Sequence, residues 1–545
     1  MFDSKIVEIR GEKTLSERDF SRQFRLFGWI ILGICLISLA VFELISYRYR
    51  FHSDAATAGM LALEQMRTKS LFVHGWSYSQ DFWPVFVFNF VTALHPVIKN
   101  AYLATEIQIL LQTLAIFAVS SRLVGLNRGS GLSHMVLAFL FSGVSALWAD
   151  TFFGQGQYGN VLLWVVCGCT LVVSIRTNPS RTRKYAALAG LFLLNAYINT
   201  TSIRYLILFS GAAVGSLVWC CLFEKRLADC KYSLLAIGAI LASTVLGQQG
   251  FSYLTSHYDF IDGVNGAGIV GYDKALSINV AKLLHGFGTL LSDNQTQRQV
   301  TSIPGAFNLY QLTAAVGLLG FILYGAKRLA FAGTGEVAFR QRFIASFFSM
   351  ILFVSVFILL FTNAAFDNVG AARYLATAMF MGLILAAIHI DDMRVPLKFQ
   401  LVVTAFLLPL IGYNIFNLNA DLFKGQRPER DGLAKFMAAN GLKSGYATFW
   451  QADALTVQSN YRVHVFHIAD DRLDPWLFMS TKRFYCDPQE EGNFILLTQD
   501  QVGKFDFSSV PAELRASMVE YSYHQFHIFK YDGRLLKNWC DAAEG

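Results

Sequence analysis

Residues 26–47 read LFGWIILGICLISLAVFELISY, a mostly apolar stretch that decides the fold class. About 20 apolar residues in a helix span the hydrocarbon core of a bilayer. The stretch is longer than the core of a signal peptide, and no small-residue cleavage site follows it. The preceding segment, 1–25, is polar and rich in Lys and Arg. We therefore expect a signal anchor with a cytoplasmic N-terminus.

The composition of the whole chain agrees with a surface that faces lipid. The chain has 545 residues and a formal net charge of +7, with 54% hydrophobic and only 15% charged residues. Soluble domains have roughly 25% charged residues. The same figures exclude a fully disordered chain and a coiled coil. Nucleic-acid binding is excluded as well, because Lys and Arg are spread between apolar blocks instead of forming one dense patch.

Further apolar blocks repeat this pattern along the chain. Together with the first one they predict about eleven transmembrane helices, and hence a polytopic α-helical membrane protein. The later blocks lie near 101–121, 132–149, 159–176, 185–202, 203–223, 232–249, 306–326, 343–363, 373–390 and 397–417.

One more apolar stretch, 82–97, is too short to be assigned by length. If it does not cross, the Lys and Arg between the spans gather on the side of the N-terminus, and the opposite loops 150–158 and 364–372 contain none. Cytoplasmic loops carry the excess of Lys and Arg. We therefore expect 82–97 to lie on or dip into the membrane, which makes 48–100 and 250–305 long outer loops.

The last part of the chain, 420–545, differs in composition from the membrane domain at 26–419. It combines charged and turn residues with strand-like runs and one helix-like stretch. With an odd number of spans before it, we predict a small α/β domain on the outer side. The strand-like runs lie at 446–449, 494–498 and 527–531, and the helix-like stretch at 432–440.

The cysteines and histidines predict no metal cluster. Only two of the eight cysteines, Cys486 and Cys540, fall in the outer domain. A disulfide between them suits an oxidising compartment, and two unpaired thiols are the alternative, because two cysteines fix no geometry. The chain has no CxxC motif and no HxxxH or HExxH spacing.

Asp54 is the first candidate for chemistry, because it lies just after the first span. It is followed by the amphipathic stretch 55–69, which predicts a helix along the membrane interface. Ser53 or Asp54 is a good N-cap for that helix. Asp54 also suits a general base held near the bilayer surface. The two roles are compatible, since a helix end fixes a carboxylate rigidly.

Asp150 is the second candidate, at the outer end of the third apolar block. The loop after it contains Gln155, Gln157 and Tyr158 among several glycines, and no positive charge. Amides and aromatic rings suit the hydroxyls and faces of a sugar. The alternative is a glycine-rich connection with a solvated Asp.

Two arginines and a second aromatic segment complete the outer candidates. Arg204 and Arg373, the latter followed by Tyr374, lie at outer span ends against the positive-inside trend. Arginine there suggests a bound phosphate, which the guanidinium fork matches, whereas snorkelling or a local ion pair is the alternative. Asp81 and Trp83 lie in an aromatic segment that suits sugar contacts or an interfacial belt.

Together these features resemble the GT-C superfamily of integral-membrane glycosyltransferases over most of the chain. The resemblance rests on the topology, on Asp54 at the start of the first outer loop, on Asp150 and on the Arg373-Tyr374 pair. Within the superfamily the chain looks most like bacterial enzymes that modify lipopolysaccharide, O-antigen or cell-wall glycans. Further matching features are Ala62-Leu63-Glu64-Gln65-Met66, Gly75 and Pro84.

The resemblance implies a hexosyltransferase of the bacterial inner membrane with a periplasmic C-terminal domain. Its donor would be a sugar on a polyprenyl phosphate, and its acceptor a hydroxyl of an envelope glycan or lipid. Arg204 or Arg373 would stabilise the leaving phosphate, and Asp54 would take the acceptor proton in an inverting displacement. Asp150 would orient the acceptor or bind a divalent cation. Substrate contacts would come from His52, Asp81, Trp83, Gln155, Gln157, Tyr158 and Tyr374.

Two other classes of function compete with this prediction. A transporter or flippase for a lipid-linked sugar is the main alternative, and a non-catalytic scaffold or sensor is the second. Transporters usually bury ionisable residues in the middle of spans and show internal repeats. Here the spans contain few charges and no repeat is evident.

Overall fold

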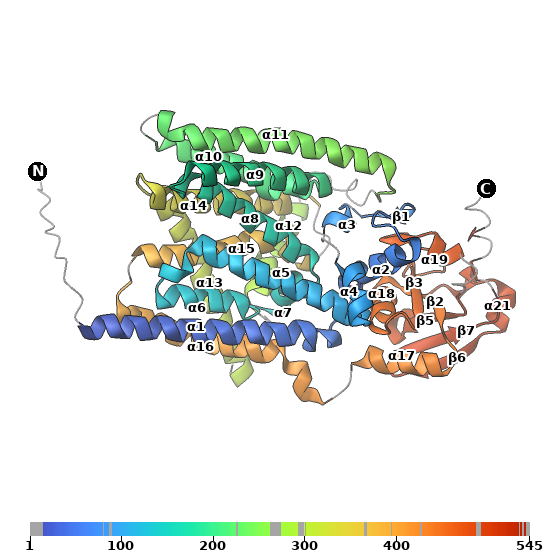
Figure 1. Ribbon diagram of the computed structural model, residues 1–545. Coiled ribbons are helices and arrows are strands. Elements are labelled where there is room, and N and C mark those ends of the chain that lie inside the picture. The colour runs from blue at the N-terminus through green and yellow to red at the C-terminus, as the bar shows by residue number, and fades with distance from the viewer. Residues whose placement is uncertain are drawn as a thin grey trace, which may run out of the picture.

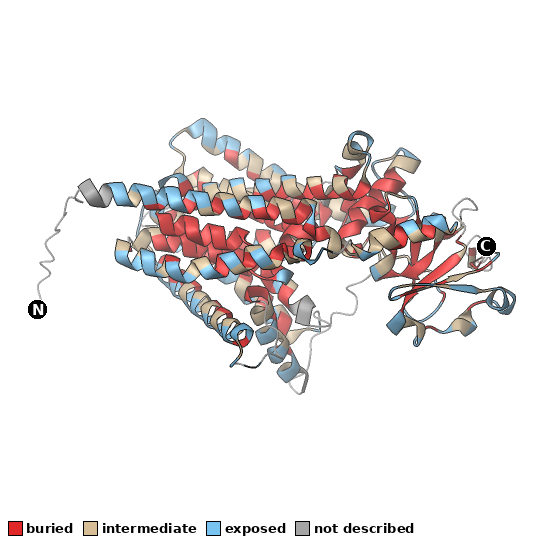
Figure 2. Cartoon of the chain, turned by 90° about the horizontal axis from the view of Figure 1, so that it is seen from below, coloured by how far each residue is buried: buried red, intermediate tan, exposed pale blue. Residues whose placement is uncertain are grey.

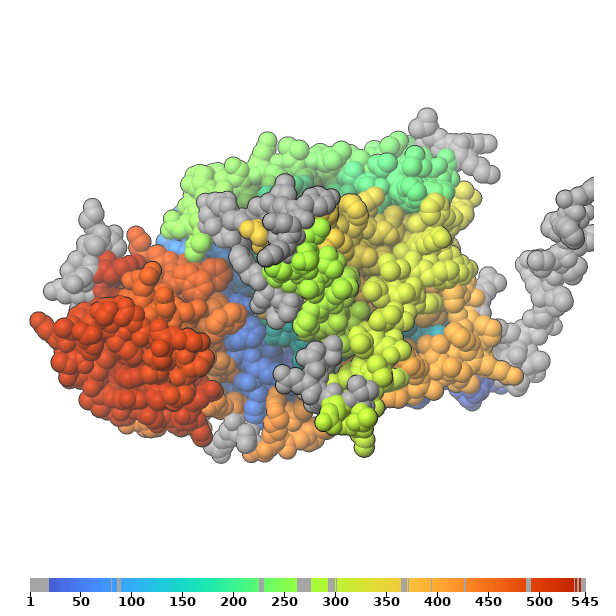
Figure 3. All heavy atoms as spheres, turned by 180° about the vertical axis from the view of Figure 1, so that it is seen from behind, coloured from blue at the N-terminus to red at the C-terminus, as the bar shows by residue number. Residues whose placement is uncertain are grey.

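The computed structural model describes residues 15–79, 81–86, 90–224, 227–261, 274–292, 299, 301–363, 368–393, 395–425, 428–486, 492–533, 535–536 and 539–540. A bundle of long helices forms one end of the molecule, and a small sheet domain built from the C-terminal part forms the other (Figure 1). Seen from behind, the sheet domain is a compact mass at the end of the helical body (Figure 3). The prediction of a polytopic helical protein with a C-terminal α/β domain is confirmed.

Eight helices in the described part of the chain are long and apolar enough to cross a membrane. Their outward faces carry large apolar side chains that are exposed, such as Ile37, Val316 and Phe353, and buried residues fill the centre of the bundle (Figure 2). This is the surface that lipid requires. The eight helices are α1 (Leu15–Leu44), α5 (Ala101–Val124), α8 (Gln157–Thr177), α11 (Leu227–His257), α13 (Ile303–Ala330), α14 (Glu336–Phe361), α15 (Asn368–Met393) and α16 (Leu397–Leu418).

Three of the eleven predicted blocks differ from a simple span. The block 132–149 becomes α6 (Gly131–Phe141), which makes a bend of 83° with the helical segment Ala146–Gly154. The block 203–223 gives a shorter apolar helix, Leu206–Leu222. By length and composition alone, eight helices qualify as spans among the described residues, or nine with the bent pair.

The third exception is α9 (Arg181–Thr201), which is long enough but carries polar side chains inside the bundle. The side-chain amide of Asn195 donates to the Ser243 hydroxyl of α11 at 2.8 Å and to the main-chain carbonyl of Ile240 at 3.0 Å. Such bonds join α9 to α11, and the polar side chains that make them lower the mean hydropathy of α9. Polar side chains that bond across helices are common in membrane bundles.

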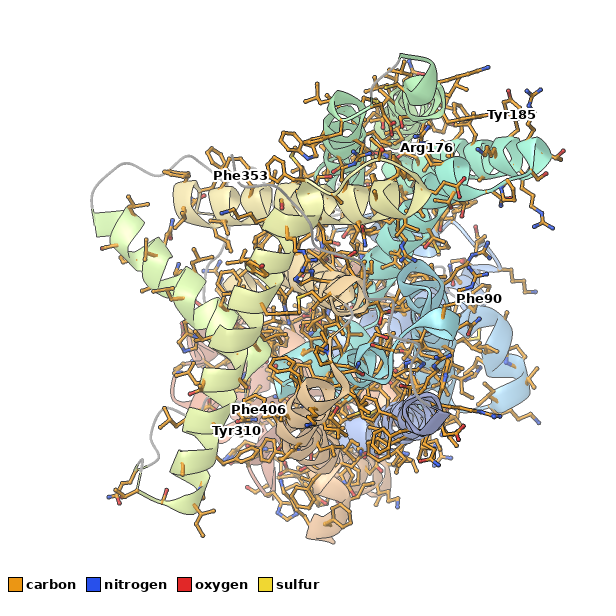
Figure 4. The ribbon with its side chains drawn as sticks, turned by 90° about the vertical axis from the view of Figure 1, so that its left-hand side faces the viewer. Phe90, Arg176, Tyr185, Tyr310, Phe353 and Phe406 are labelled. Carbon is orange, nitrogen blue, oxygen red and sulfur yellow. A yellow bond between two sulfur atoms is a disulfide. The ribbon has the colours of Figure 1, made fainter. Side chains whose placement is uncertain are left out.

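The basic residues of the bundle gather at the end opposite the sheet domain. Arg176 and Arg342 both contact Glu224, at 2.8 and 3.4 Å, and Arg328 lies 3.2 Å from Asp392. Figure 4 views the bundle from this end and labels Arg176. Each of these three arginines is thus paired with an acid inside the bundle.

The C-terminal domain is a five-stranded mixed sheet in the order β3-β2-β5-β7-β6. The first three strands of that order are parallel to one another. The fourth strand is antiparallel to both of its neighbours in the sheet. The run predicted at 494–498 is a strand with those bounds, and the other two predicted strands differ by one or two residues. The strands are β2 (Ser444–Thr448), β3 (His464–Ile468), β5 (Phe494–Thr498), β6 (Val519–Tyr523) and β7 (Phe526–Lys530), with helices α17 (Glu429–Ala439), α18 (Phe449–Gln458), α19 (Arg483–Cys486), α20 (Gln499–Val502) and α21 (Ala512–Ala516).

The long outer loop joins the two parts of the molecule. Its short strand β1 (Trp76–Ser77) pairs with β4 (Ser480–Thr481) of the C-terminal domain. In the stretch 82–97, α3 (Trp83–Phe86) and α4 (Val91–Ile98) are too short to span a bilayer. The remaining elements are η1 (Ser46–Tyr49), α2 (Ser53–Thr68), η2 (Leu126–Arg128), α7 (Ala146–Ala149), η3 (Asp150–Gly154), η4 (Leu206–Gly211), α10 (Ala212–Leu222), α12 (Lys274–Leu291), η5 (Ala420–Lys424) and η7 (Phe507–Ser509).

The amphipathic stretch 55–69, which predicts a helix along the membrane interface, forms helix α2, and most of its surface is covered by protein. It is buried along most of its length and packs against α4, α5 and α18. A Cβ atom on Gly59 would lie only 2.8 Å from Val457 of α18, and the main-chain carbonyl of Gly59 accepts a hydrogen bond from the Tyr461 hydroxyl at 2.7 Å. The small residues of α2 therefore serve close packing against the C-terminal domain.

Candidate active site

Asp150 is the centre of a hydrogen-bonded cluster at the end of the bundle nearest the sheet domain. Its Oδ1 accepts from the Tyr47 hydroxyl at 2.7 Å and lies 3.1 Å from His52 Nε2. Its Oδ2 accepts from the Gln155 side-chain amide at 2.6 Å. The carboxylate thus has a fixed orientation, since three side chains hold its two oxygens.

The glycine-rich loop after Asp150 serves packing. Residues Asp150–Gly154 form a single turn of π-helix, a feature that is frequent at functional sites. A Cβ atom on Gly154 would lie 2.5 Å from the Tyr47 ring, so only glycine lets Tyr47 reach Asp150. Gln155 is buried and holds Asp150, and Gln157 contacts Gln155 at 3.4 Å.

His52 links Asp150 to Asp54. Burial alone would lower the pKa of His52, but its hydrogen bond to Asp150 and the negative charges of Asp150 and Asp54 raise that pKa above its ordinary value. A protonated His52 can therefore share its charge between the two carboxylates.

Asp54 lies in the first turn of α2 and faces Arg373. Its Oδ2 is 3.5 Å from Nη2 of Arg373, and the two side chains are 16% and 21% exposed. Both side chains are thus partly exposed, and we call the space around them the recess. The N-cap prediction is wrong, because the cap position is His52 and no side chain caps the helix. The Ser53 hydroxyl instead donates to the main-chain carbonyl of Phe449.

A second acid–arginine pair lies beside the first one. Arg204 Nη2 is 3.2 Å from Oδ2 of Asp81, which is almost fully buried, and the Ser202 hydroxyl donates to Oδ1. Burial raises the pKa of Asp81 above its ordinary value, while Arg204 and then Ser202 act against that rise. The local π-helix η4 begins two residues after Arg204.

Two tyrosines connect the two pairs. The guanidinium of Arg373 lies over the Tyr158 ring, 5.8 Å from its centroid. Burial alone would lower the pKa of Arg204, but Asp81, Tyr158 and Tyr374 are close enough to raise it. The structure therefore brings most of the candidate residues into one cluster.

Trp83 is a candidate whose one polar group already has a partner within the chain. It is buried, and its indole N–H donates to the Ser79 hydroxyl at 3.1 Å. Sequence reasoning missed Tyr47 and Trp450. Tyr47 could have been noticed as a polar aromatic residue at the end of the first span, but nothing in the sequence connects Trp450 with His52.

The C-terminal domain contacts the start of α2. The rings of His52 and Trp450 have centroids 6.0 Å apart. Arg430 donates through Nη1 to the main-chain carbonyl of Phe51 and through Nη2 to the Gln451 side chain at 3.0 Å. The segment that carries His52 and Asp54 is therefore held from both parts of the molecule.

The residues of this cluster do not fit a metal ion. Over the described ranges no three His, Cys, Asp or Glu side chains converge in a way that could hold one. Asp54 faces a guanidinium, and Asp150 is held by three side chains.

A long apolar cavity of about 620 Å³ lies between α6, α13, α15 and α16. It extends from Val144, at the bend before Asp150, to Met393 at the far end of α15. Phe406 of α16 lines the cavity and lies beside Tyr310 of α13 (Figure 4), with ring centroids 4.8 Å apart. Only a few of its lining residues are polar, among them Gln311 and Asn414.

Solved structures similar to this chain include two crystal structures of one protein. Neither a family model nor a curated protein sequence matches the chain. The crystal structure of ArnT from Cupriavidus metallidurans in the apo state is similar with a TM-score of 0.42 and 10% identity, over 92% of this chain and 98% of that one. The structure of the same protein bound to undecaprenyl phosphate gives 0.41 and 11%, over 93% and 99%. The chemistry of this chain therefore rests on its own side chains.

Proposed function

We propose that the chain is a GT-C type glycosyltransferase that moves a sugar from a polyprenyl-phosphate-linked donor to a hydroxyl of a cell-envelope glycan or lipid. The observation that carries the proposal is the pair of acid–arginine contacts, Asp54–Arg373 and Arg204–Asp81, that flank Tyr158 at one end of a membrane bundle. A base and a phosphate-binding cation in one recess are the two groups that this reaction needs.

Asp54 acts as the general base in an inverting displacement. The acceptor oxygen forms a bond to the anomeric carbon while the bond from that carbon to the phosphate oxygen breaks. The acceptor proton passes to Asp54, and the electron pair leaves with the phosphate. Base and leaving group must stand on opposite sides of the anomeric carbon.

This geometry assigns different roles to the two arginines. Arg373 is only 3.5 Å from Asp54, so it orients the base. Arg204 lies next to Asp81 and near Tyr158 and Tyr374, and it stabilises the leaving phosphate. Asp150 is a positioning residue that acts through His52.

The long apolar cavity suits the hydrocarbon tail of the donor. Its length along the bundle, its apolar lining and its start at the bend before Asp150 support this assignment. When the bond between the sugar and the phosphate breaks at the outer end, the chain of the polyprenyl phosphate would remain between α13 and α16. A lipid of the membrane can replace it there.

A bulky residue in this cavity should discriminate between long and short donors. Gly317 lines the cavity, and a Cβ atom there would meet nothing within 4 Å. We expect Gly317→Trp to lower kcat/KM for a C55 donor about tenfold, since losing two buried methylenes costs roughly 1.6 kcal/mol. For a C10 donor, the kcat/KM of the variant should equal that of the wild type.

Gly320→Trp is the matched control, because Gly320 lies on the same helix and does not line the cavity. The measurement is a steady-state transfer assay with both donors in detergent micelles. Equal losses for both donors in Gly317→Trp would place the tail elsewhere.

The charge pattern supports a periplasmic location for the site and the C-terminal domain, because the basic end of the bundle belongs in the cytoplasm. In the structure Cys486 and Cys540 form a disulfide, and the other six cysteines are free. We expect six thiols to be alkylated in freshly denatured protein and two more only after reduction. Mass spectrometry of the alkylated protein counts the modified thiols.

Cys486→Ser should in addition destabilise the C-terminal domain by about 4 kcal/mol, the loop-closure value for a loop of this length. Eight reactive thiols in unreduced protein from intact cells would mean that this domain is in a reducing compartment.

A direct assay separates the enzyme from a transporter. Purified full-length protein in nanodiscs, given undecaprenyl phosphate carrying a radiolabelled sugar and an extract of envelope glycans, should release undecaprenyl phosphate and label the glycans. A flippase would instead move the intact donor across proteoliposomes and leave its glycosidic bond unbroken.

A further inference from the structure

The parallel strands of the C-terminal domain direct one edge of the sheet at the recess. Because β3, β2 and β5 are parallel, they end at the same edge, at Ile468, Thr448 and Thr498. After β2 the chain forms β3 on one side of β2, and it later forms β5 on the other side of β2. Such a topological switch point is where open α/β sheets bind their ligands.

The end of β2 meets the end of α2 that carries the proposed base. Phe449, the residue after β2, accepts the hydrogen bond from the Ser53 hydroxyl, and Trp450 contacts the His52 ring. Helices α2 and α18 thus start side by side (Figure 1). A molecule at this edge of the sheet would lie next to Asp54.

Two partly exposed tryptophans form an aromatic platform at this edge. Trp450 is 48% exposed and Trp476 is 42% exposed. Phe449 packs against both rings at 5.3 Å, and Trp476 stacks on Phe478 at 5.1 Å. The Trp476 main-chain N–H donates to the carbonyl of His467 in β3, which fixes the platform to the sheet.

This platform has no role in the mechanism above, and exposed tryptophans that share a packed cluster are typical of binding sites. A cluster that adjoins a carboxylate and a histidine suits a neutral polar molecule with an apolar face. A sugar ring has such a face, formed by its C–H groups, and its hydroxyls would point towards Asp54.

We propose that the Trp450 and Trp476 platform is the acceptor subsite and that it binds a pyranose ring of a carbohydrate acceptor. This inference rests on the proposed function, because it places the attacking hydroxyl at Asp54. It assigns the choice of acceptor to the C-terminal domain and the handling of the donor to the bundle.

Isothermal titration of the full-length protein in nanodiscs tests the proposal. The probe is the set of oligosaccharides released by mild acid from the envelope glycans of the source cell, separated by size. We expect the wild type to bind one fraction with a saturable isotherm. Trp450→Leu and Trp476→Leu should raise Kd about tenfold, and Trp450→Phe, which keeps a ring, should stay within about threefold of the wild type.

Trp29→Leu is the matched control, since Trp29 is a partly exposed tryptophan of α1 in the membrane bundle. It should leave Kd unchanged, and thermal unfolding should show that each variant is folded. Wild-type affinity in both leucine variants, or binding of the platform to the lipid of the nanodisc with no response to any oligosaccharide, would overturn the subsite.

Asp54→Asn separates this proposal from the proposed function. It should bind the same fraction with the wild-type Kd and fail to transfer sugar to it. If Asp54→Asn transfers at the wild-type rate, the proposed mechanism fails while the binding results for the tryptophan variants still decide the subsite.

Discussion

Replacing Asp54 with Asn should lower kcat for sugar transfer by 10²- to 10⁴-fold, the range that loss of a general base causes. Asparagine has the same shape but cannot take a proton from the acceptor hydroxyl. The donor should still bind with a similar KM, because the phosphate is held by Arg204 and the tail by the bundle. Initial rates with radiolabelled donor at saturating acceptor measure the effect.

The chain offers a matched control for this substitution. Asp392 pairs with Arg328 at 3.2 Å at the opposite end of the bundle. Asp392→Asn removes a similar acid–arginine contact far from the recess, and it should keep activity within about twofold. An Asp54→Asn variant with normal kcat, together with an inactive Asp150→Asn variant, would assign the base to Asp150 instead.

The position of the site could be predicted from the sequence because topology fixes it. Charge between apolar blocks decides which ends of the helices face outward, so Asp54, Asp150, Arg204 and Arg373 had to share one side. The structure places them in one cluster with contacts of 3.1 to 3.5 Å to their partners. The order of the apolar blocks and the charges between them therefore located the candidates.

The partners of these residues could not be predicted, because they depend on packing between distant segments. Tyr47 reaches Asp150 only because Gly154 leaves room for its ring. Trp450 meets His52 across almost 400 residues of chain. The amphipathic pattern of α2 indicated a lipid interface, but a protein surface, the C-terminal domain, covers it.

Breaks inside the apolar blocks could not be predicted for a related reason. A block of apolar residues does not reveal a bend such as the 83° break after α6, nor a π-turn that shortens a helix. Both π-turns lie next to candidate residues, Asp150 and Arg204. Irregular backbone at membrane depth is tolerated where it is buried in protein or lines a water-filled cavity, so the length rule fails next to these two candidates.

Removing Arg204 should abolish most of the activity and also destabilise the protein, for two separable reasons. Arg204→Gln removes the cation that stabilises the leaving phosphate, and kcat should fall by 10²- to 10³-fold. It also leaves the buried Asp81 carboxylate without its counter-charge, which costs about 3–5 kcal/mol of unfolding free energy.

The pH dependence of stability identifies the second effect. Burial already raises the pKa of Asp81, and loss of Arg204 removes the main opposing influence, so that pKa should rise further. The folded variant then binds more protons than the unfolded chain, and its unfolding free energy should fall as the pH rises above the ordinary carboxyl range. Thermal unfolding in detergent at several pH values measures this slope.

The double variant Arg204→Gln/Asp81→Asn should regain stability and lose the pH slope, since the buried charge is gone. It should remain inactive, because the phosphate still lacks its cation, whereas Arg204→Lys should recover part of kcat with a single point charge. Recovery of transfer in the double variant would contradict the assigned role, because it would mean that Arg204 serves only to neutralise Asp81. In that case Arg373, the remaining guanidinium of the recess, would have to hold the phosphate as well as face the base.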